Sequence, residues 1–410
     1  MTWPTASTTL GTSVTFYGRG YGHGVGMSQY GAKGRAKAGQ TAAQILAAYF
    51  KGSTPGAVSS TQNTRVLLLS GFNAVSTAPL VVRGRVTPWT IDGVKATFPS
   101  NGTLTVWRTK KTVDGVVTTT WRYRVTASDG SPLAEGTAGK QLVIRGASTL
   151  SRLQLVSKPS SYDTYRGILK LFLGTSTLNV VNHLPLDLYL RGVVPVEMSS
   201  DWPTEALKAQ TIAARSYAVR RLHPTNGTYD LFDDTRSQVY RGVEAETTTT
   251  NTLITSVPGK VITYGGSVVN AFFFSTGGGA TENNEYVFVS SSGGVGSAVP
   301  YLRGIPDRRP DGTAWDAGAP VYAWQSSTLT RSQLSAMFKR DARTNVGDLT
   351  RLDLTKRGVS GRLYRVTLTG SAGSKTVSAD VFRSVYNAYR PSGTLSLRSN
   401  LLDTKPIAGS

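Results

Sequence analysis

One glutamate, Glu197, stands in an apolar stretch of the chain just before a predicted helix. Its apolar neighbours are Val194, Pro195, Val196 and Met198, and no acid or base lies within three positions. A carboxyl group in such surroundings is poorly hydrated, so its charged form is disfavoured and its pKa rises. A raised pKa suits a general acid that works near neutral pH. The alternative is a surface glutamate at a helix entrance, where the helix dipole favours negative charge.

The helix after this glutamate has clear sequence signals. Asp201 is a predicted N-cap, Pro203 fits the first turn, and residues 206–221 contain no Gly or Pro. At about 100° per residue, Lys208 and Arg215 fall on one stripe, two turns apart. If that stripe faces a cleft, the two are fixed cations beside the carboxyl group. Alternatively, they are solvated residues on an exposed helix.

Three separate motifs resemble the SpoIID/LytB family of sporulation and cell-wall proteins. The first is the EM…ALKAQ…AARSY pattern of residues 194–217. The second is GHGVGMSQYGA, within residues 18–53, and the third is the AFFFSTGG…TE segment at 271–282. With the further stretches 64–71, 166–190 and 357–400, the likeness covers most of the chain.

The order of these motifs differs from that usual in the family. There the GHGVGMSQ element follows a segment similar to residues 357–400, whereas here it opens the chain. A circular permutation is the simplest account, since ends that lie close in space tolerate it. We therefore expect residues 16–50 to pack against residues 395–402. We also expect the glycine-rich loop to lie beside the helix that follows Glu197.

The resemblance implies a lytic transglycosylase that cuts between N-acetylmuramic acid and N-acetylglucosamine in peptidoglycan. Glu197 occupies the place of the presumed catalytic acid. It would protonate the glycosidic oxygen and then, as a carboxylate, deprotonate the muramic C6 hydroxyl, which closes a 1,6-anhydro ring. This needs no second carboxylate, unlike ordinary glycosidases. The family also implies a rival function, a non-catalytic wall binder that enhances a partner amidase.

The same resemblance implies a set of substrate-binding residues. In the helix after Glu197 they are Lys208, Arg215 and Ser216, where a cation could stabilise developing negative charge or hold a substrate carboxylate. In the other two motifs they are His23, Ser28, Gln29, Ser275 and Thr276.

The glycine-dense element also has a plain structural interpretation. Glycines alternate along residues 18–26 with His23 among them, a spacing that lets backbone approach another segment closely. It does not match the dinucleotide fingerprint, because His23 takes the third glycine's place. The glycines could therefore serve a tight turn, with His23 a hydrogen-bonded structural residue. A helix interrupted at Gly39 is expected over residues 32–50.

Composition restricts the partners and cofactors. The chain has 45 Lys and Arg against 24 Asp and Glu, a formal net charge of +21, so it should adhere to polyanions such as teichoic acids or anionic wall glycans. No nucleic-acid motif is present, and we expect no nucleic-acid partner. The three histidines, His23, His183 and His223, lack metal-type spacing, and His183 is expected in a loop. With no cysteine, disulfides and cysteine-held zinc are excluded, and we expect no metal or cofactor.

The expected fold class is α+β: a mixed, β-rich core with a substrate cleft and a β-rich insertion. Residues 1–54 hold the permuted glycine-rich segment, residues 64–75 a core strand, residues 76–160 the insertion, and residues 163–403 the SpoIID-like core. No apolar run of 18 residues spans a membrane. The start Met1-Thr2-Trp3-Pro4 lacks a signal peptide, so we expect a mature region of an extracellular or cell-wall protein.

Overall fold

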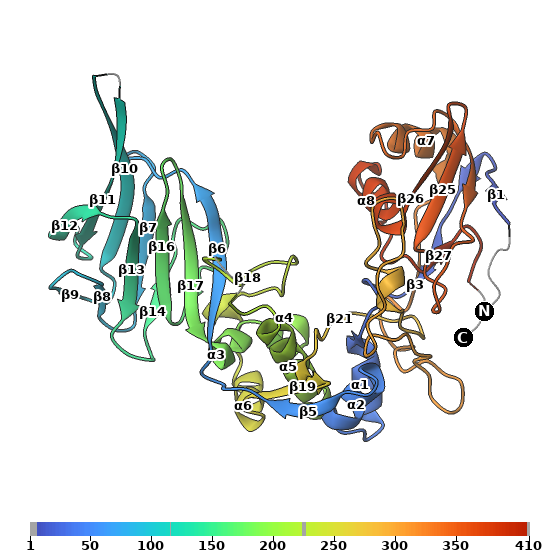
Figure 1. Cartoon of the computed structure of the whole chain (residues 1–410), viewed down its shortest axis with the longest axis horizontal. Coiled ribbons are helices and arrows are strands. Elements are labelled where there is room, and N and C mark those ends of the chain that lie inside the picture. The colour runs from blue at the N-terminus through green and yellow to red at the C-terminus, as the bar shows by residue number, and fades with distance from the viewer. Residues whose placement is uncertain (1–5, 115, 224–226, 408–410) are drawn as a thin grey trace. The chain divides into compact units, whose positions relative to one another are not determined.

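The computed structural model describes residues 6–114, 116–223 and 227–407, so Met1–Pro4 lie outside the described residues. Its contacts divide the chain into two compact units (Figure 1). Unit 1 comprises Met1–Pro55, Trp202–Ala209 and Ile262–Ser410, and unit 2 comprises Gly56–Asp201 and Gln210–Val261. One division, between Asp201 and Trp202, precedes α5 (Thr204–Val219), and the others fall inside β5 (Thr54–Ala57), α5 and β19 (Lys260–Tyr264). Helices and many small and large sheets occur together, which confirms the β-rich α+β class.

Unit 2 contains two large sheets. The seven-stranded sheet has the order β18-β6-β17-β16-β13-β8-β9, and the six-stranded sheet has the order β12-β11-β10-β7-β14-β15. The strands of the first are β6 (Asn63–Phe72), β8 (Trp89–Ile91), β9 (Thr97–Phe98), β13 (Gln141–Gly146), β16 (Ile168–Leu173), β17 (Leu178–Pro185) and β18 (Leu231–Phe232). Those of the second are β7 (Leu80–Arg85), β10 (Thr103–Val113), β11 (Val116–Thr126), β12 (Pro132–Ala138), β14 (Arg152–Gln154) and β15 (Thr164–Tyr165).

The two sheets of unit 2 share a core. β7 alternates buried and half-buried residues along its whole length, as expected when one face packs and the other meets solvent. A Cβ on Gly84 of β7 would lie 2.2 Å from the ring of Trp89, a buried residue of β8 in the other sheet. Glycine at this position therefore lets the indole fit between the sheets. Strands from residues 76–160 enter both sheets, and β13 pairs with β16.

The helices of unit 2 follow β17 in sequence. They are α3 (Leu186–Arg191), α4 (Val194–Glu197), the 3-10 turn η1 (Gly242–Ala245) and α6 (Thr248–Ser256), with the second part of α5. Helix α5 begins at Thr204, three residues beyond Asp201, so the predicted start at Asp201 is wrong and Pro203 directly precedes the first turn. His183 lies in β17, not in a loop, because Val181 and Leu184 beside it are core residues of the sheet.

Unit 1 is built around a four-stranded sheet of order β1-β24-β25-β26 and a set of short ladders. Its strands are β1 (Thr8–Thr9), β2 (Ser13–Val14), β3 (Tyr17–Arg19), β4 (Met27–Ser28), β20 (Ser267–Val268), β21 (Phe273–Phe274), β22 (Ala323–Gln325), β23 (Leu329–Thr330), β24 (Leu349–Asp353), β25 (Arg365–Gly370), β26 (Gly373–Ser378) and β27 (Leu402–Asp403). Its helices are α1 (Gln29–Lys37), α2 (Ala42–Tyr49), η2 (Asn284–Tyr286), α7 (Arg331–Lys339) and α8 (Ala379–Tyr389). No helix in the described ranges is long and apolar enough to cross a membrane.

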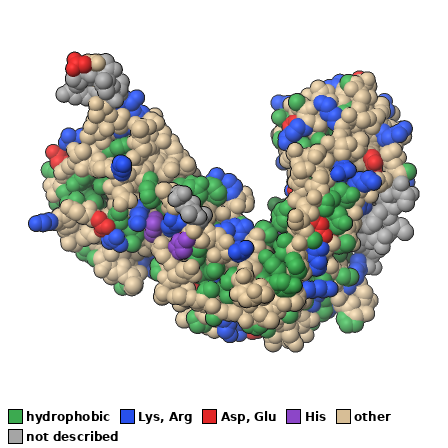
Figure 2. Space-filling model, viewed as in Figure 1, with side chains coloured by type: hydrophobic (Ala, Val, Ile, Leu, Met, Phe, Trp, Pro, Cys, Tyr) green, Lys and Arg blue, Asp and Glu red, His purple; other side chains and the backbone are tan. Residues whose placement is uncertain are grey.

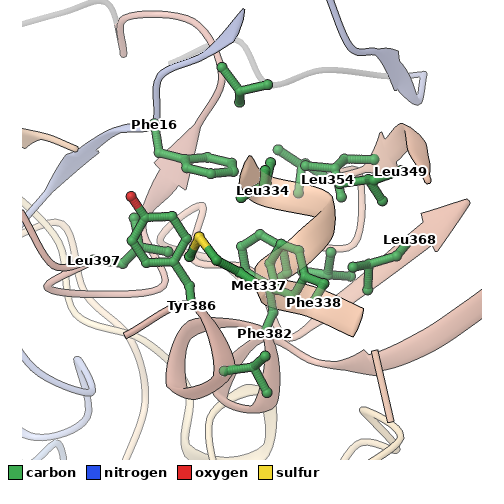
Figure 3. Close-up of a cluster of buried hydrophobic side chains, with 14 of the residues drawn as sticks. Phe16, Leu334, Met337, Phe338, Leu349, Leu354, Leu368, Phe382, Tyr386 and Leu397 are labelled. Atoms are coloured by element: carbon green, nitrogen blue, oxygen red, sulfur yellow. The ribbon is translucent and has the colours of Figure 1, made fainter. Parts of the chain in front are cut away.

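The start and the end of the chain share one core in unit 1 (Figure 3). Phe16 meets the rings of Phe382 and Tyr386 on α8 edge-on, with centroids 5.7 and 5.8 Å away. Leu397 belongs to the same buried cluster, and β3 pairs with β27. The expected packing of residues 16–50 against residues 395–402 is therefore confirmed, while the permutation itself stays a prediction.

Candidate active site

Glu197 is the last residue of the one-turn helix α4. Its N–H donates to the carbonyl of Val193 at 3.1 Å, and Val194 and Met198 on either side of it are buried. The Glu197 side chain is half-buried. The acidic residue in the first turn of α5 is Glu205, so Glu197 does not stand at the entrance of the long helix. The apolar setting expected from the sequence is present in part, because Val194 and Met198 are buried whereas Val196 is exposed.

Two tyrosines of unit 2 interact electrostatically with the Glu197 carboxylate. Burial raises the pKa of Tyr189 well above its ordinary value, and nearby Tyr217, Tyr240 and Glu197 raise it further. Burial also raises the pKa of Tyr217, with Glu197 adding to the effect. Both phenols therefore stay protonated at neutral pH and keep their O–H donors. The Tyr189 hydroxyl donates to Gln238 at 3.1 Å.

Arg221 completes this group. Its guanidinium lies over the Tyr217 ring, 3.4 Å from the centroid, and donates to the Tyr217 carbonyl at 3.1 Å. Burial lowers the pKa of Arg221, while the two phenols oppose that effect. The sequence pattern did not indicate a role for Tyr189 or Arg221. The i, i+4 spacing of Tyr217 and Arg221 does indicate that these two side chains share one helix face.

Arg215 is an internal ion-pair partner. Its side chain is fully buried, and its Nε and one Nη lie 2.9 and 2.8 Å from Asp187 Oδ1. A further Nη donates to the carbonyl of Lys260 at 3.0 Å. The expectation of a solvated residue on an exposed helix is wrong for Arg215. The Ser216 hydroxyl is also buried and donates to the Ile212 carbonyl at 2.7 Å.

Lys208 lies in the part of α5 that belongs to unit 1. Its ammonium is 2.7 Å from Glu205 Oε1, and about 30% of its side chain is exposed. The other Glu205 oxygen accepts the N–H of Ala42, at the start of α2. Glu197 belongs to unit 2, so the placement of Lys208 beside Glu197 stays a prediction.

His23 is held by backbone on both sides of its ring. Nε2 donates to the carbonyl of Phe273 at 3.1 Å, and Nδ1 accepts the N–H of Val25 at 3.0 Å. Phe272 and Phe274 pack against the ring. Burial lowers the pKa of His23 to about 4, with the Arg362 cation adding to the effect. The imidazole is therefore neutral near pH 7, which favours the structural interpretation of this residue.

The structure brings the glycine-rich and AFFFSTGG motifs together within unit 1. β4 pairs in parallel with β21, and Tyr21 and Thr276 exchange backbone hydrogen bonds of 2.9 and 3.0 Å. Ser28 caps α1 by accepting the N–H of Gly31, and its hydroxyl also accepts the N–H of Gly277.

The remaining expected residues lie at the same contact. Gln29 and Thr276 are buried, and the Ser275 hydroxyl lies 3.1 Å from that of Thr276. These contacts position the two loops, and substrate binding by His23, Ser28, Gln29, Ser275 or Thr276 stays a prediction.

Alternating glycines make this contact possible. Gly20, Gly22, Gly24 and Gly26 all have positive φ, between 72° and 106°. A Cβ on Gly26 would lie 2.2 Å from the Phe272 carbonyl oxygen. Only glycine combines that conformation with so close an approach.

A buried ion network not expected from the sequence supports the same loops. Glu282 accepts the backbone N–H groups of Val359 and Ser360 at 2.9 and 3.0 Å. Arg362 donates to the carbonyls of Gly277 and Ala280 at 2.7 and 3.0 Å. Burial lowers the pKa of Arg362 to about 10, and the nearby Glu282 opposes this shift. Within the described residues, no group of three or more His, Cys, Asp or Glu is arranged to hold a metal ion.

Comparisons with known proteins agree with the resemblance. The SpoIID family model, described as stage II sporulation protein, matches residues 174–264, which include Glu197, Arg215 and Tyr217. The resemblance to the SpoIID/LytB family is thus confirmed, and the chain is a relative of these proteins. No solved structure matches it.

Individual relatives cover only part of the chain. Stage II sporulation protein D of Bacillus subtilis is 32% identical over 224 residues, which are 50% of this chain and 57% of that protein. The amidase enhancer of Bacillus subtilis is 35% identical over 157 residues, 35% of this chain and 20% of that protein. An uncharacterised protein of Brachyspira hyodysenteriae is 37% identical over 143 residues, 34% of this chain and 37% of that protein. The chain therefore spans less than two thirds of each of these relatives.

Proposed function

We propose that the protein is a lytic transglycosylase acting on peptidoglycan glycan strands, with Glu197 as general acid and base. The observation that carries the proposal is a half-buried carboxyl group that stands in sequence between the buried Val194 and Met198 and interacts electrostatically with two phenols that stay protonated. Poor hydration favours the protonated carboxyl that a general acid needs. Relatives with sporulation and amidase-enhancer names support a protein of the cell wall, outside the membrane.

The reaction uses Glu197 twice. As an acid it protonates the glycosidic oxygen, the bond from that oxygen to the muramic C1 breaks, and the N-acetylglucosamine end leaves as an alcohol. As a carboxylate it then takes the proton of the muramic C6 hydroxyl, whose oxygen attacks C1 and closes the 1,6-anhydro ring. The acid is restored without water.

The surrounding residues have supporting roles in this proposal. Tyr217 is a neutral donor that stabilises the carboxylate between the two steps, Arg221 adds positive charge nearby, and Tyr189 holds its O–H on Gln238. Arg215 positions α5 through Asp187 and does not touch the glycan. Lys208 and the residues of the two paired loops, all in unit 1, are candidates for contact with the strand, whereas the buried Ser216 hydroxyl donates to the Ile212 carbonyl. Anionic wall polymers and a cell-wall amidase are further candidate partners.

A substitution of Glu197 tests the assignment. Glu197→Gln keeps the size of the side chain but cannot transfer the proton, so the cleavage rate should fall about 10²–10⁴-fold, while binding to strands survives. Glu244→Gln, in η1 of the same unit, is a matched control and should cleave normally. Equal activity of both variants would remove Glu197 from the mechanism.

The amidase-enhancer function is the second candidate. It is favoured by the 35% identity to the Bacillus subtilis amidase enhancer over 157 residues. In that case the wild-type protein would release no anhydro products from purified strands, yet would increase the release of stem peptides by an added wall amidase. Glu197→Gln would leave that stimulation unchanged.

A further inference from the structure

The outer face of the six-stranded sheet is unusually rich in arginine. Residues directly opposite one another in an antiparallel pair share a face. The register therefore places Trp107 and Arg122 together, Arg124 with Thr105, and Arg83 with Thr103. Arg85 lies opposite Arg152 on the next pair of strands. The opposite face carries Val82, Leu104, Val106, Val125 and Leu153, all buried, so the arginines face away from the core.

Charge on this outer face is almost entirely positive. It carries Arg83 and Arg85 from β7, Arg122 and Arg124 from β11, and Arg152 from β14. The acidic strand residue on the face, Glu135, is paired with Arg124, and both side chains are more than half exposed. Residues 76–160 as a whole have 12 Lys and Arg against four Asp and Glu. Figure 2 likewise shows many more Lys and Arg side chains than Asp and Glu side chains on the visible surface.

The arginines are spaced to hold an extended anion. Arg83 donates to the Thr103 hydroxyl at 3.4 Å, and Arg85 contacts the neutral side chains of Gln154 and Asn101. For Arg122 the described residues provide no hydrogen-bond or ion-pair partner. From β14 to β11 the face spans three strand spacings, about 14 Å. Fixed guanidinium groups across that length can pair with several carboxylates in succession.

Trp107 indicates which class of anionic polymer fits this face. It is a half-buried indole on the same face, among arginines and threonines. A broad aromatic surface with polar surroundings stacks on the apolar face of a ring. A sugar ring presents such a face, and a polyol phosphate chain does not.

We propose that this face, defined by Trp107 with Arg83, Arg85, Arg122, Arg124 and Arg152, is a second, non-catalytic binding site for a glycan strand that bears carboxylates. Trp107 stacks on a sugar ring, and the arginines pair with carboxylates along the strand. The site keeps the protein on the polymer while the catalytic residues act. It extends the proposed function, because it assigns the same class of polymer to a surface of unit 2 separate from Glu197.

Binding of the full chain carrying Glu197→Gln to purified, peptide-free glycan strands tests this site without turnover. Arg83→Ala with Arg122→Ala should weaken binding by about tenfold or more, from the loss of two charge-assisted contacts. Trp107→Ala should weaken it to a similar degree. The matched control is Lys95→Ala with Arg145→Ala, which removes the same charge from β13 and the β8–β9 turn in the other sheet. It should change the affinity less than about twofold.

The outcomes are distinct. Strands with reduced carboxyl groups should bind weakly and should not respond to the arginine variants. Equal losses from the control pair, or unchanged binding of reduced strands, would overturn the site. So would a polyglycerol phosphate or a single-stranded oligonucleotide that binds more tightly than the glycan and depends on Trp107. Because the experiment measures binding without cleavage, it still tests this site if the catalytic proposal fails.

Discussion

Replacing Arg215 with methionine should destabilise the protein through a buried charge. The guanidinium is fully buried, and Asp187 keeps about 20% of its side chain exposed. Breaking a buried pair typically costs about 3–5 kcal/mol, because the remaining charge is uncompensated. Burial already raises the pKa of Asp187, and Arg215 opposes this rise, so in Arg215→Met the carboxyl group can take up a proton. We therefore expect a loss near the lower end, about 3 kcal/mol in the free energy of unfolding.

The paired substitution separates the charge from the packing. Asp187→Asn leaves the buried cation unpaired, and arginine cannot deprotonate to relieve it. This variant should lose at least as much stability as Arg215→Met, while the double variant should recover about 1–3 kcal/mol of the summed losses.

Urea unfolding followed by circular dichroism at pH 7 measures these values. The control is Arg343→Met, which removes an exposed guanidinium paired with Asp341 and should cost much less than Arg215→Met. Arg215→Met could instead lose less than about 1 kcal/mol of the free energy of unfolding and still lose most of its cleavage activity. That result would refute the structural role of Arg215 and support a role in substrate binding.

Three further predictions follow from the paired loops and the charge. Burial lowers the pKa of His23 from 6.5 to about 4. The neutral imidazole therefore contributes fully to the free energy of unfolding above pH 6.5, and this contribution is lost as the pH falls toward 4. Over that pH range the free energy of unfolding should fall by about 2–3 kcal/mol more in the wild type than in His23→Gln. Gly26→Ala should cost more than about 2 kcal/mol of the free energy of unfolding, from its positive φ and the clash with a carbonyl. Gly39→Ala, with positive φ but open space, should cost about 1 kcal/mol in the same urea unfolding experiment. Sedimentation with intact walls should weaken with salt, since exposed charges are screened over about 10 Å at 0.1 M, and binding that ignores salt would contradict an electrostatic attachment.

Local sequence signals predicted several elements well. The break at Gly39 separates α1 from α2, and residues 76–160 form strands as expected. The alternating glycines mark a real close approach of two backbones. These features depend on conformational preferences of single residues and their neighbours, which the sequence displays directly.

The sequence pattern could not predict contacts between residues that lie far apart in the chain. The burial of Arg215 depends on Asp187, 28 positions earlier, and on a carbonyl 45 positions later. The neutral state of His23 depends on burial of the imidazole, to which Phe272 and Phe274, some 250 residues away, contribute. Periodicity identifies which residues share a helix face, but not what packs against that face. It therefore left Arg215 open between a cleft and solvent, and the structure gives neither.

Mass spectrometry of the products tests the central claim most directly. Purified glycan strands, with and without stem peptides, are incubated with wild-type protein and with Glu197→Gln. We expect wild-type fragments that end in 1,6-anhydro-muramic acid, one water lighter than reducing ends, and nearly none from the variant. Reducing ends that have gained water, or anhydro ends released equally by Glu197→Gln, would contradict it.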